Sequence, residues 1–90
     1  MKKIALPILL LFILSAKATL FRNKGPSFVI VYYYVKGRLN ICKLFSPGVL
    51  VVENLQRWPL PYFKNCAFIQ YDEQRDEYIL ESPNPQPDLE

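Results

Sequence analysis

The chain has 90 residues, with 11 lysines and arginines, 8 aspartates and glutamates, and no histidine. This length fits one small domain. Because histidine is absent, a Ser-His-Asp triad or a Cys-His pair cannot form, so the common nucleophilic hydrolases and proteases are excluded. The strongly apolar stretches 28–35 and 49–52 argue against an intrinsically disordered chain.

The first 18 residues have the pattern of a secretory signal peptide. Two lysines precede the apolar run 4–14, and Ala16-Lys17-Ala18 provides a small-residue cleavage site. We therefore expect cleavage after Ala18 and a secreted or periplasmic protein. The alternative is a single-pass membrane protein that keeps residues 4–21 as a transmembrane helix. The uninterrupted apolar run is shorter than the roughly 20 residues that a membrane span requires.

Removal of the leader changes the charge of the chain. Three lysines would leave with it, and the remaining 72 residues carry eight basic and eight acidic side chains. Residues 19–64 hold seven basic residues and Glu53, whereas residues 65–90 hold Arg75 and seven acidic residues. A basic half can attract nucleic acid or another anionic surface. Since the basic residues are scattered along expected strands, we expect the two halves to neutralise each other across one fold.

The first part of the mature chain favours strands. Residues 19–27 contain glycine, proline and charged side chains and are expected to form an extended, solvated lead-in. The run 28–35 is almost entirely β-branched and aromatic, which predicts a central strand. Gly37 then allows a short hairpin with a bulge. A second strand follows over 39–45, in which period-two alternation places Leu39, Ile41 and Phe45 on one face and Arg38, Asn40 and Cys42 on the other.

The later strands are shorter. Pro47 and Gly48 fit the two central positions of a type II turn, and this turn leads into a strand over 49–55. Further strands are expected over 66–71 and 77–81, joined by a polar turn. A helix across this last stretch is disfavoured because its residues form no apolar stripe.

These elements predict an all-β domain over residues 28–81. The expected architecture is a small antiparallel meander of about five strands, arranged as a curled sheet or a small barrel. Residues 82–90 have proline at every second position from 83 to 87. They are expected to form a disordered, proline-rich acidic tail.

Two cysteines remain after removal of the leader, Cys42 and Cys66. In an oxidising compartment an even number of cysteines indicates a disulfide, and we expect one between these two residues. The alternative is a pair of free thiols. The Cys-x-x-Cys motif of redox proteins is absent, and two thiolates without histidine cannot complete a structural zinc site. We expect no metal and no cofactor.

Residues 57–63 form the best candidate for a binding surface. The segment contains two prolines among aromatic side chains, and such residues suit protein interfaces because they bury much area at a small loss of entropy. The alternative is that Trp58 and Phe63 cover an open end of the sheet. The partner-binding candidates are Arg57, Trp58, Leu60, Tyr62 and Phe63.

Other sites have weaker support. Tyr32, Tyr33 and Tyr34 with nearby basic residues could stack on single-stranded nucleic acid, but a strand in the core explains the tyrosines better, and we expect no nucleic-acid partner. Carboxylates could act as acid and base at a glycosidic bond. Here the acidic cluster fits a solvated turn better; it comprises Asp72, Glu73, Asp76 and Glu77.

No motif in these residues points to a known family. The hypothesis that the sequence favours is an exported, non-catalytic domain that binds another envelope or extracellular protein. The second hypothesis is an accessory protein anchored by residues 4–21, and membrane contact is expected only in that case. A third, enzymatic hypothesis rests on the acidic cluster alone.

Overall fold

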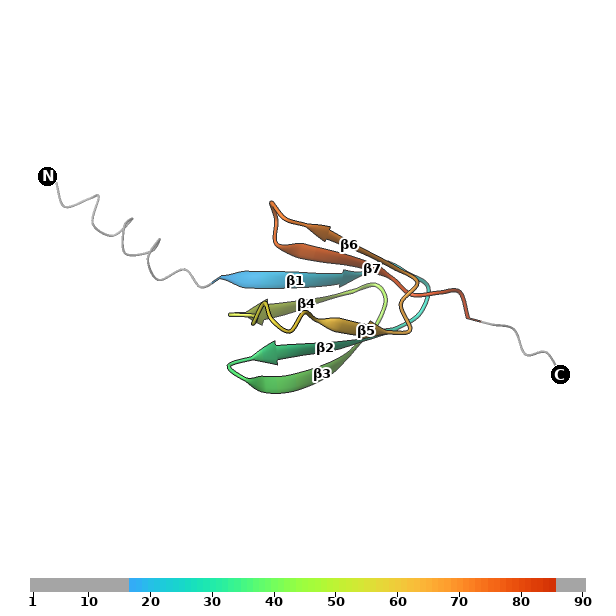
Figure 1. Ribbon diagram of the computed structural model, residues 1–90. Helices are drawn as coiled ribbons and strands as arrows, with labels where there is room; N and C mark the ends of the chain where they lie inside the picture. Colours follow the sequence, from blue (N-terminus) through green and yellow to red (C-terminus); the bar gives the residue numbers. More distant parts are fainter. Residues whose placement is uncertain (1–16, 86–90) are drawn as a thin grey trace, which may run out of the picture.

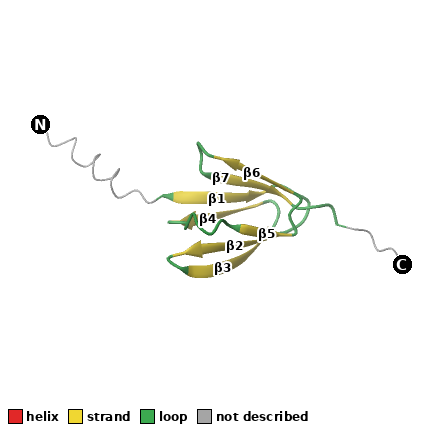
Figure 2. Ribbon diagram, viewed as in Figure 1, coloured by secondary structure: helices red, strands yellow, loops and turns green. Residues whose placement is uncertain are grey.

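The computed structural model describes residues 17–85, and these residues form an all-β fold without helices (Figures 1 and 2). The prediction of an all-β domain is therefore confirmed. The expected five-stranded meander or barrel is wrong, because seven strands form two separate sheets that do not close into a barrel. The strands are β1 (Ala18–Asn23), β2 (Val29–Val35), β3 (Arg38–Leu44), β4 (Gly48–Glu53), β5 (Tyr62–Lys64), β6 (Phe68–Asp72) and β7 (Glu77–Glu81).

The order of strands explains why a simple meander does not form. One sheet has the order β4-β1-β7-β6, and the other has the order β3-β2-β5. Strand β1 pairs with β4 in antiparallel orientation and with β7 in parallel orientation, so segments distant in sequence become neighbours. The two sheets face each other and share one core (Figure 1).

Strand β1 replaces most of the expected lead-in. The prediction that residues 19–27 are solvated is wrong, because Thr19, Phe21 and Asn23 are all buried. These three residues alternate with more exposed ones, as expected of a strand with one face on the core. Polar residues occupy two of the three buried positions, so the alternation carries little hydrophobic signal in the sequence.

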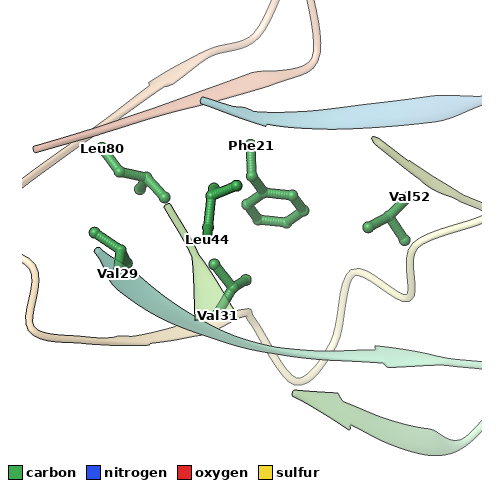
Figure 3. Packing of buried hydrophobic residues seen from close by; sticks show 6 residues of the cluster. All are labelled: Phe21, Val29, Val31, Leu44, Val52 and Leu80. Carbon is green, nitrogen blue, oxygen red and sulfur yellow. The ribbon is translucent and has the colours of Figure 1, made fainter. Parts of the chain in front are cut away.

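The core is small and is centred on Phe21. Six apolar residues are buried, and Figure 3 shows their side chains meeting between the sheets. The ring of Phe21 stacks on Tyr78 with centroids 5.0 Å apart, and it also contacts Tyr33 and Phe63 of the opposite sheet. The buried apolar residues are Phe21, Val29, Val31, Leu44, Val52 and Leu80.

Two turns differ from their predicted form. The hairpin at Gly37 has no bulge, because Val35 pairs directly with Arg38 across a two-residue loop. Both loop residues, Lys36 and Gly37, have positive φ, which matches a type I′ turn and the twist of the flanking strands.

The type II turn at residues 47 and 48 does not form as predicted. Gly48 has no positive φ and is the first residue of β4. Glycine is required there for another reason, since a Cβ atom at this position would collide with the backbone carbonyl of Phe45.

The predicted disulfide is absent, and Cys42 and Cys66 are both free. Cys42 lies on β3 opposite Val31, whereas Cys66 follows β5, which pairs with the other side of β2. Strands on either side of a central strand are about 9–10 Å apart, which exceeds the roughly 7 Å limit between the Cα atoms of a disulfide. The cysteines instead act as small side chains, and Cys66 packs against the core.

Hydrogen bonds from Asn23 close one end of the sandwich. Asn23 is 1% exposed, and its Nδ2 donates to the carbonyl oxygens of Ser27 at 2.8 Å and Leu44 at 3.0 Å. Its Oδ1 accepts from the backbone N–H of Gly25 at 3.0 Å. One amide side chain therefore joins the end of β1 to the end of β3 and to the chain that leads into β2.

Ser82 completes this closed end. Its Oγ accepts from the backbone N–H of Ser27 at 2.8 Å and donates to the carbonyl of the same residue at 2.6 Å. A Cβ atom on Gly25 would collide with the backbone of Ser82, so the chains meet closely here. The predicted disordered tail is thus wrong for Ser82, which is buried, and residues 86–90 lie outside the described residues.

The predicted leader lies almost entirely outside the described residues, which begin at Lys17. Residues 18–21 belong to β1, so a transmembrane helix could not extend to Phe21 while this sheet is formed. The described part of the chain contains no helix long and apolar enough to cross a membrane. Cleavage after Ala18 stays a prediction, and it would leave Thr19 through Asn23 available for β1.

We expect Asn23→Ala to lower the free energy of unfolding by about 2 kcal/mol, because buried hydrogen-bonding groups would lose their partner. Urea unfolding followed by circular dichroism measures this change. Asn40→Ala is the control, since its side chain makes an exposed hydrogen bond to the carbonyl of Arg38. That variant should change stability by less than about 0.5 kcal/mol. Equal losses in the two variants would contradict a structural role for Asn23.

Candidate binding surface

The loop between β4 and β5, residues 54–61, carries large apolar side chains in water. Trp58 is 75% exposed and Leu60 is 61% exposed. Pro59 and Pro61 lack the backbone donor that a sheet ladder needs, so the segment runs as a loop between the two strands. The exposed pair is therefore placed at the surface by the local sequence.

Gln56 fixes this loop to the β2–β3 hairpin. Its backbone N–H donates to the carbonyl of Tyr34 at 2.8 Å, and its side-chain Oε1 accepts from the N–H of Gly37 at 2.8 Å. Its Nε2 donates to the carbonyl of Trp58 at 2.7 Å. Gln56 therefore ties the backbone of Trp58 to the β2–β3 hairpin.

An apolar cleft of about 290 Å³ lies beside the loop, between β5 and β6. These strands belong to different sheets, and each has only one strand neighbour, so the seam between the sheets is open here. The floor is formed by Phe63 and Tyr78, whose rings are 5.8 Å apart. The lining residues are Leu60, Pro61, Tyr62, Phe63, Ile69 and Tyr78.

A more polar hollow, which we call the Asp76 pocket, shares Leu60 and Tyr78 with the cleft and has a volume of about 350 Å³. Both carboxylate oxygens of Asp76 are occupied. One accepts from Thr19 Oγ1 at 2.9 Å, and the other accepts from the Tyr71 hydroxyl at 2.7 Å. Asp76 therefore links β1 to the β6–β7 hairpin. The other polar side chains that line the pocket include Lys17, Asn54 and Arg57.

Arg57, Tyr71 and Tyr78 in the Asp76 pocket keep their protons at neutral pH, because the pKa of each is raised. The hydrogen bond to Asp76 and then burial raise the pKa of Tyr71, and burial is the main cause that raises the pKa of Tyr78. Hydrogen bonding to Tyr71 raises the pKa of Arg57, with further contributions from the charges of Tyr71 and Asp76. The pocket therefore offers the Arg57 guanidinium and the Tyr78 hydroxyl as donors, while the Tyr71 hydroxyl already donates to Asp76.

The five predicted binding residues divide into two groups. Arg57, Trp58, Leu60 and Tyr62 are exposed, and Leu60 and Tyr62 line the apolar cleft. Phe63 instead points inward, with its ring centroid 6.0 Å from that of Phe21. The alternative that both Trp58 and Phe63 cover the core thus holds for Phe63, while Trp58 lies in solvent. Whether the exposed residues bind a partner stays a prediction.

Sequence reasoning missed the residues that position this surface. Gln56 carries no signal in a single sequence, because its role depends on the hairpin reached through Tyr34. The acidic turn was expected to be solvated, and this is wrong for Asp76 and Glu77. Glu77 is 5% exposed and accepts from Arg22 Nε at 2.6 Å. The available signal for the Tyr71–Asp76 hydrogen bond was an acidic cluster with a tyrosine five residues before Asp76.

Comparison of the chain with protein-family models, with curated proteins and with solved structures finds no match. Within residues 17–85, no three cysteine, aspartate or glutamate side chains converge on a point where they could hold a metal ion. The surface must therefore be interpreted from its own shape and chemistry.

Stability should fall at alkaline pH with a contribution from Tyr71. Its pKa is raised above the ordinary value of 10.0 in the folded protein, so the folded state binds this proton more tightly than the unfolded chain. The resulting stability is fully present below about pH 10 and is lost as pH rises through the folded pKa. Tyr71→Phe should therefore lose less stability than the wild type above about pH 10.

Thermal unfolding followed over a series of alkaline pH values measures the slope of stability against pH. Tyr62→Phe is the matched control, because Tyr62 is 60% exposed and lies outside the Asp76 pocket. If Tyr71→Phe and Tyr62→Phe change the slope equally, the bond between Tyr71 and Asp76 does not control the alkaline transition.

Proposed function

We propose that the protein is a non-catalytic binding domain whose partner is another protein of the cell envelope or the extracellular space. The contact surface is the β4–β5 loop together with the apolar cleft. The observation that carries this proposal is the set of large apolar side chains exposed on the loop and along the cleft. Trp58, on the loop, is 75% exposed, and Leu60 and Tyr62, which line the cleft, are about 60% exposed.

The arrangement of this surface favours a protein over a small metabolite. The rim residues Leu60, Tyr62 and Ile69 are about half exposed or more, so the cleft is shallow and open. Contiguous apolar side chains in water are a common mark of protein interfaces, and tryptophan and tyrosine often supply most of the binding energy there. The floor is held by core aromatic rings, so the cleft is already formed before a partner arrives.

The free edge of β6 and the apolar lining of the cleft together define the kind of partner segment that would bind here. Strand β6 is an edge strand, and its outer side is free to pair within the described residues. An extended segment of the partner can add to such an edge while an apolar side chain enters the cleft. We therefore expect the partner to contribute a strand with at least one large aliphatic or aromatic residue.

Export of the protein is the second part of the proposal, and the pattern of residues 1–18 supports it. Intact mass spectrometry of the protein recovered from its native host tests this part. We expect the measured mass to lack the first 18 residues, with Thr19 as the new N-terminus. A full-length mass would instead support the anchored accessory protein, in which the leader is retained.

Trp58→Ala tests the contact surface. We expect capture of the partner from detergent-solubilised envelope to fall at least tenfold, since tryptophan anchors at interfaces contribute about 2 kcal/mol or more. Quantitative mass spectrometry of the captured proteins measures the loss. Thermal unfolding should remain within a few degrees of the wild type, because the side chain lies in solvent.

Val51→Ala is the matched control for this experiment. Val51 is 56% exposed and lies on β4, at the opposite edge of its sheet from β6. Capture by this variant should equal that of the wild type. Equal capture by Trp58→Ala and the wild type would exclude the loop as the contact, and unfolding of Trp58→Ala would show that the side chain supports the core.

A further inference from the structure

The outer face of the β3-β2-β5 sheet is apolar and aromatic, although no element of the described residues covers it. Side chains alternate along β2, so those between the core residues point away from the core. The register places Tyr32 between Ile41 and Tyr62, and it places Tyr34 beside Leu39. We call this surface the outer β2 face.

The large apolar side chains of the outer β2 face are unusually exposed to solvent. Leu39 is 50% exposed, Ile41 is 61% exposed and Phe45 is 65% exposed. In the sequence, Leu39, Ile41 and Phe45 form the apolar face of their strand, yet the core receives Leu44 from the other face. Monomeric proteins rarely leave an apolar patch of this kind uncovered.

All charged side chains of this sheet are basic. Residues 28–45 and 62–64 contain Lys36, Arg38, Lys43 and Lys64 and contain no aspartate or glutamate. The described acidic residues lie on the other sheet or in its β6–β7 turn, and both ion pairs among residues 17–85 lie within that part of the molecule. The Arg22–Glu77 pair joins the basic and the acidic half of the chain within one sheet, whereas no ion pair among the described residues reaches the basic residues of the β3-β2-β5 sheet.

The lysines lie among the apolar residues of the face. Lys43 Nζ lies 4.4 Å from the ring centroid of Phe28 and 5.5 Å from that of Phe45, and Lys64 Nζ lies 5.9 Å from the ring of Tyr32. Their ammonium groups therefore occupy the ring faces on which nucleic-acid bases would stack. The rings of Tyr32 and Tyr62 are also tilted by 54°, so they provide no flat stacking platform.

We infer that the outer β2 face rests on the surface of a lipid bilayer with anionic headgroups. Such a surface offers negative charge and apolar chains in one thin layer, which matches lysines set among aliphatic side chains. Tyrosine rings are favoured at this depth because one end is apolar and the other is polar. This contact requires no leader, and it adds a membrane surface to the protein partner proposed above.

The test is co-sedimentation with vesicles made of equal parts phosphatidylglycerol and phosphatidylcholine, compared with vesicles of phosphatidylcholine alone. The full chain is used as the cell releases it, and because all variants share the same N-terminus, any leader contributes equally to each. We expect preferential binding to the anionic vesicles. Lys43→Gln with Lys64→Gln should weaken this binding about 30-fold, since each lysine near such a surface contributes about fivefold.

Two matched controls distinguish the contribution of the outer β2 face from general effects of charge and of surface hydrophobicity. Lys24→Gln with Arg75→Gln removes the same charge from exposed positions outside the face and should leave binding within about twofold of the wild type. Ile41→Asn should weaken binding roughly tenfold, whereas Val51→Asn should have little effect. Val51 is 56% exposed but lies on the other sheet.

Several results would overturn this inference. These are equal binding to both kinds of vesicle, equal losses in the two double variants, and equal losses in Ile41→Asn and Val51→Asn. Binding to a single-stranded oligonucleotide or to polyglutamate without binding to vesicles would assign the face to nucleic acid or to an acidic protein. Since Trp58 is unchanged in every variant, capture of the protein partner should persist, which keeps this test separate from that of the proposed function.

Discussion

The insertion of β1 between β4 and β7 is the interaction on which the rest of the structure depends. Strand β1 is the only link in its sheet between β4 and the β6–β7 hairpin among the described residues. It also supplies Phe21, whose ring contacts aromatic residues from both sheets. Without this strand, one sheet would separate into two pieces, and the small core would lose its largest buried side chain.

The same strand organises the two ends of the sandwich through polar contacts. At one end, Thr19 donates to Asp76 and so fixes the β6–β7 turn beneath the Asp76 pocket. At the other end, Asn23 joins the ends of β1 and β3. Buried polar groups are costly unless they are bonded, and every buried side-chain nitrogen and oxygen among residues 17–85 has a partner. Burial of these polar side chains beside so few apolar residues therefore leaves no unpaired buried side-chain group among the described residues.

The sequence predicted the strands that have strong β-branched and aromatic runs, and it did not predict how those strands are shared between sheets. Residues 28–35 were correctly expected to form a strand, because their composition is decisive by itself. Strand β1 was missed because two of its buried positions are Thr19 and Asn23, whose burial is possible only with partners far away in the chain. The pairing of Cys42 with Cys66 failed for the same reason, since it depends on which strand lies between them.

The candidate site could be predicted to a similar extent. An exposed aromatic loop followed from its prolines and from Trp58, which the sequence places beside Pro59. The inward direction of Phe63 did not follow, because it depends on the pairing of Phe63 with Val31 across β5 and β2. Gln56 and Asp76 act through bonds to other elements, and a single sequence contains no periodic signal for such contacts.

Because the β4–β5 loop is anchored, the two proposed surfaces, the loop with its cleft and the outer β2 face, keep a fixed orientation to each other. Gln56 bonds to the β2–β3 hairpin, which carries much of the outer β2 face, so the loop and this face belong to one rigid part of the sandwich. Tyr62 belongs to both surfaces, because it borders the cleft and also pairs with Tyr32. A domain resting on a membrane through this face would hold Trp58 at a constant orientation to the bilayer. Such placement would reduce the orientational entropy lost when a partner in the same envelope binds.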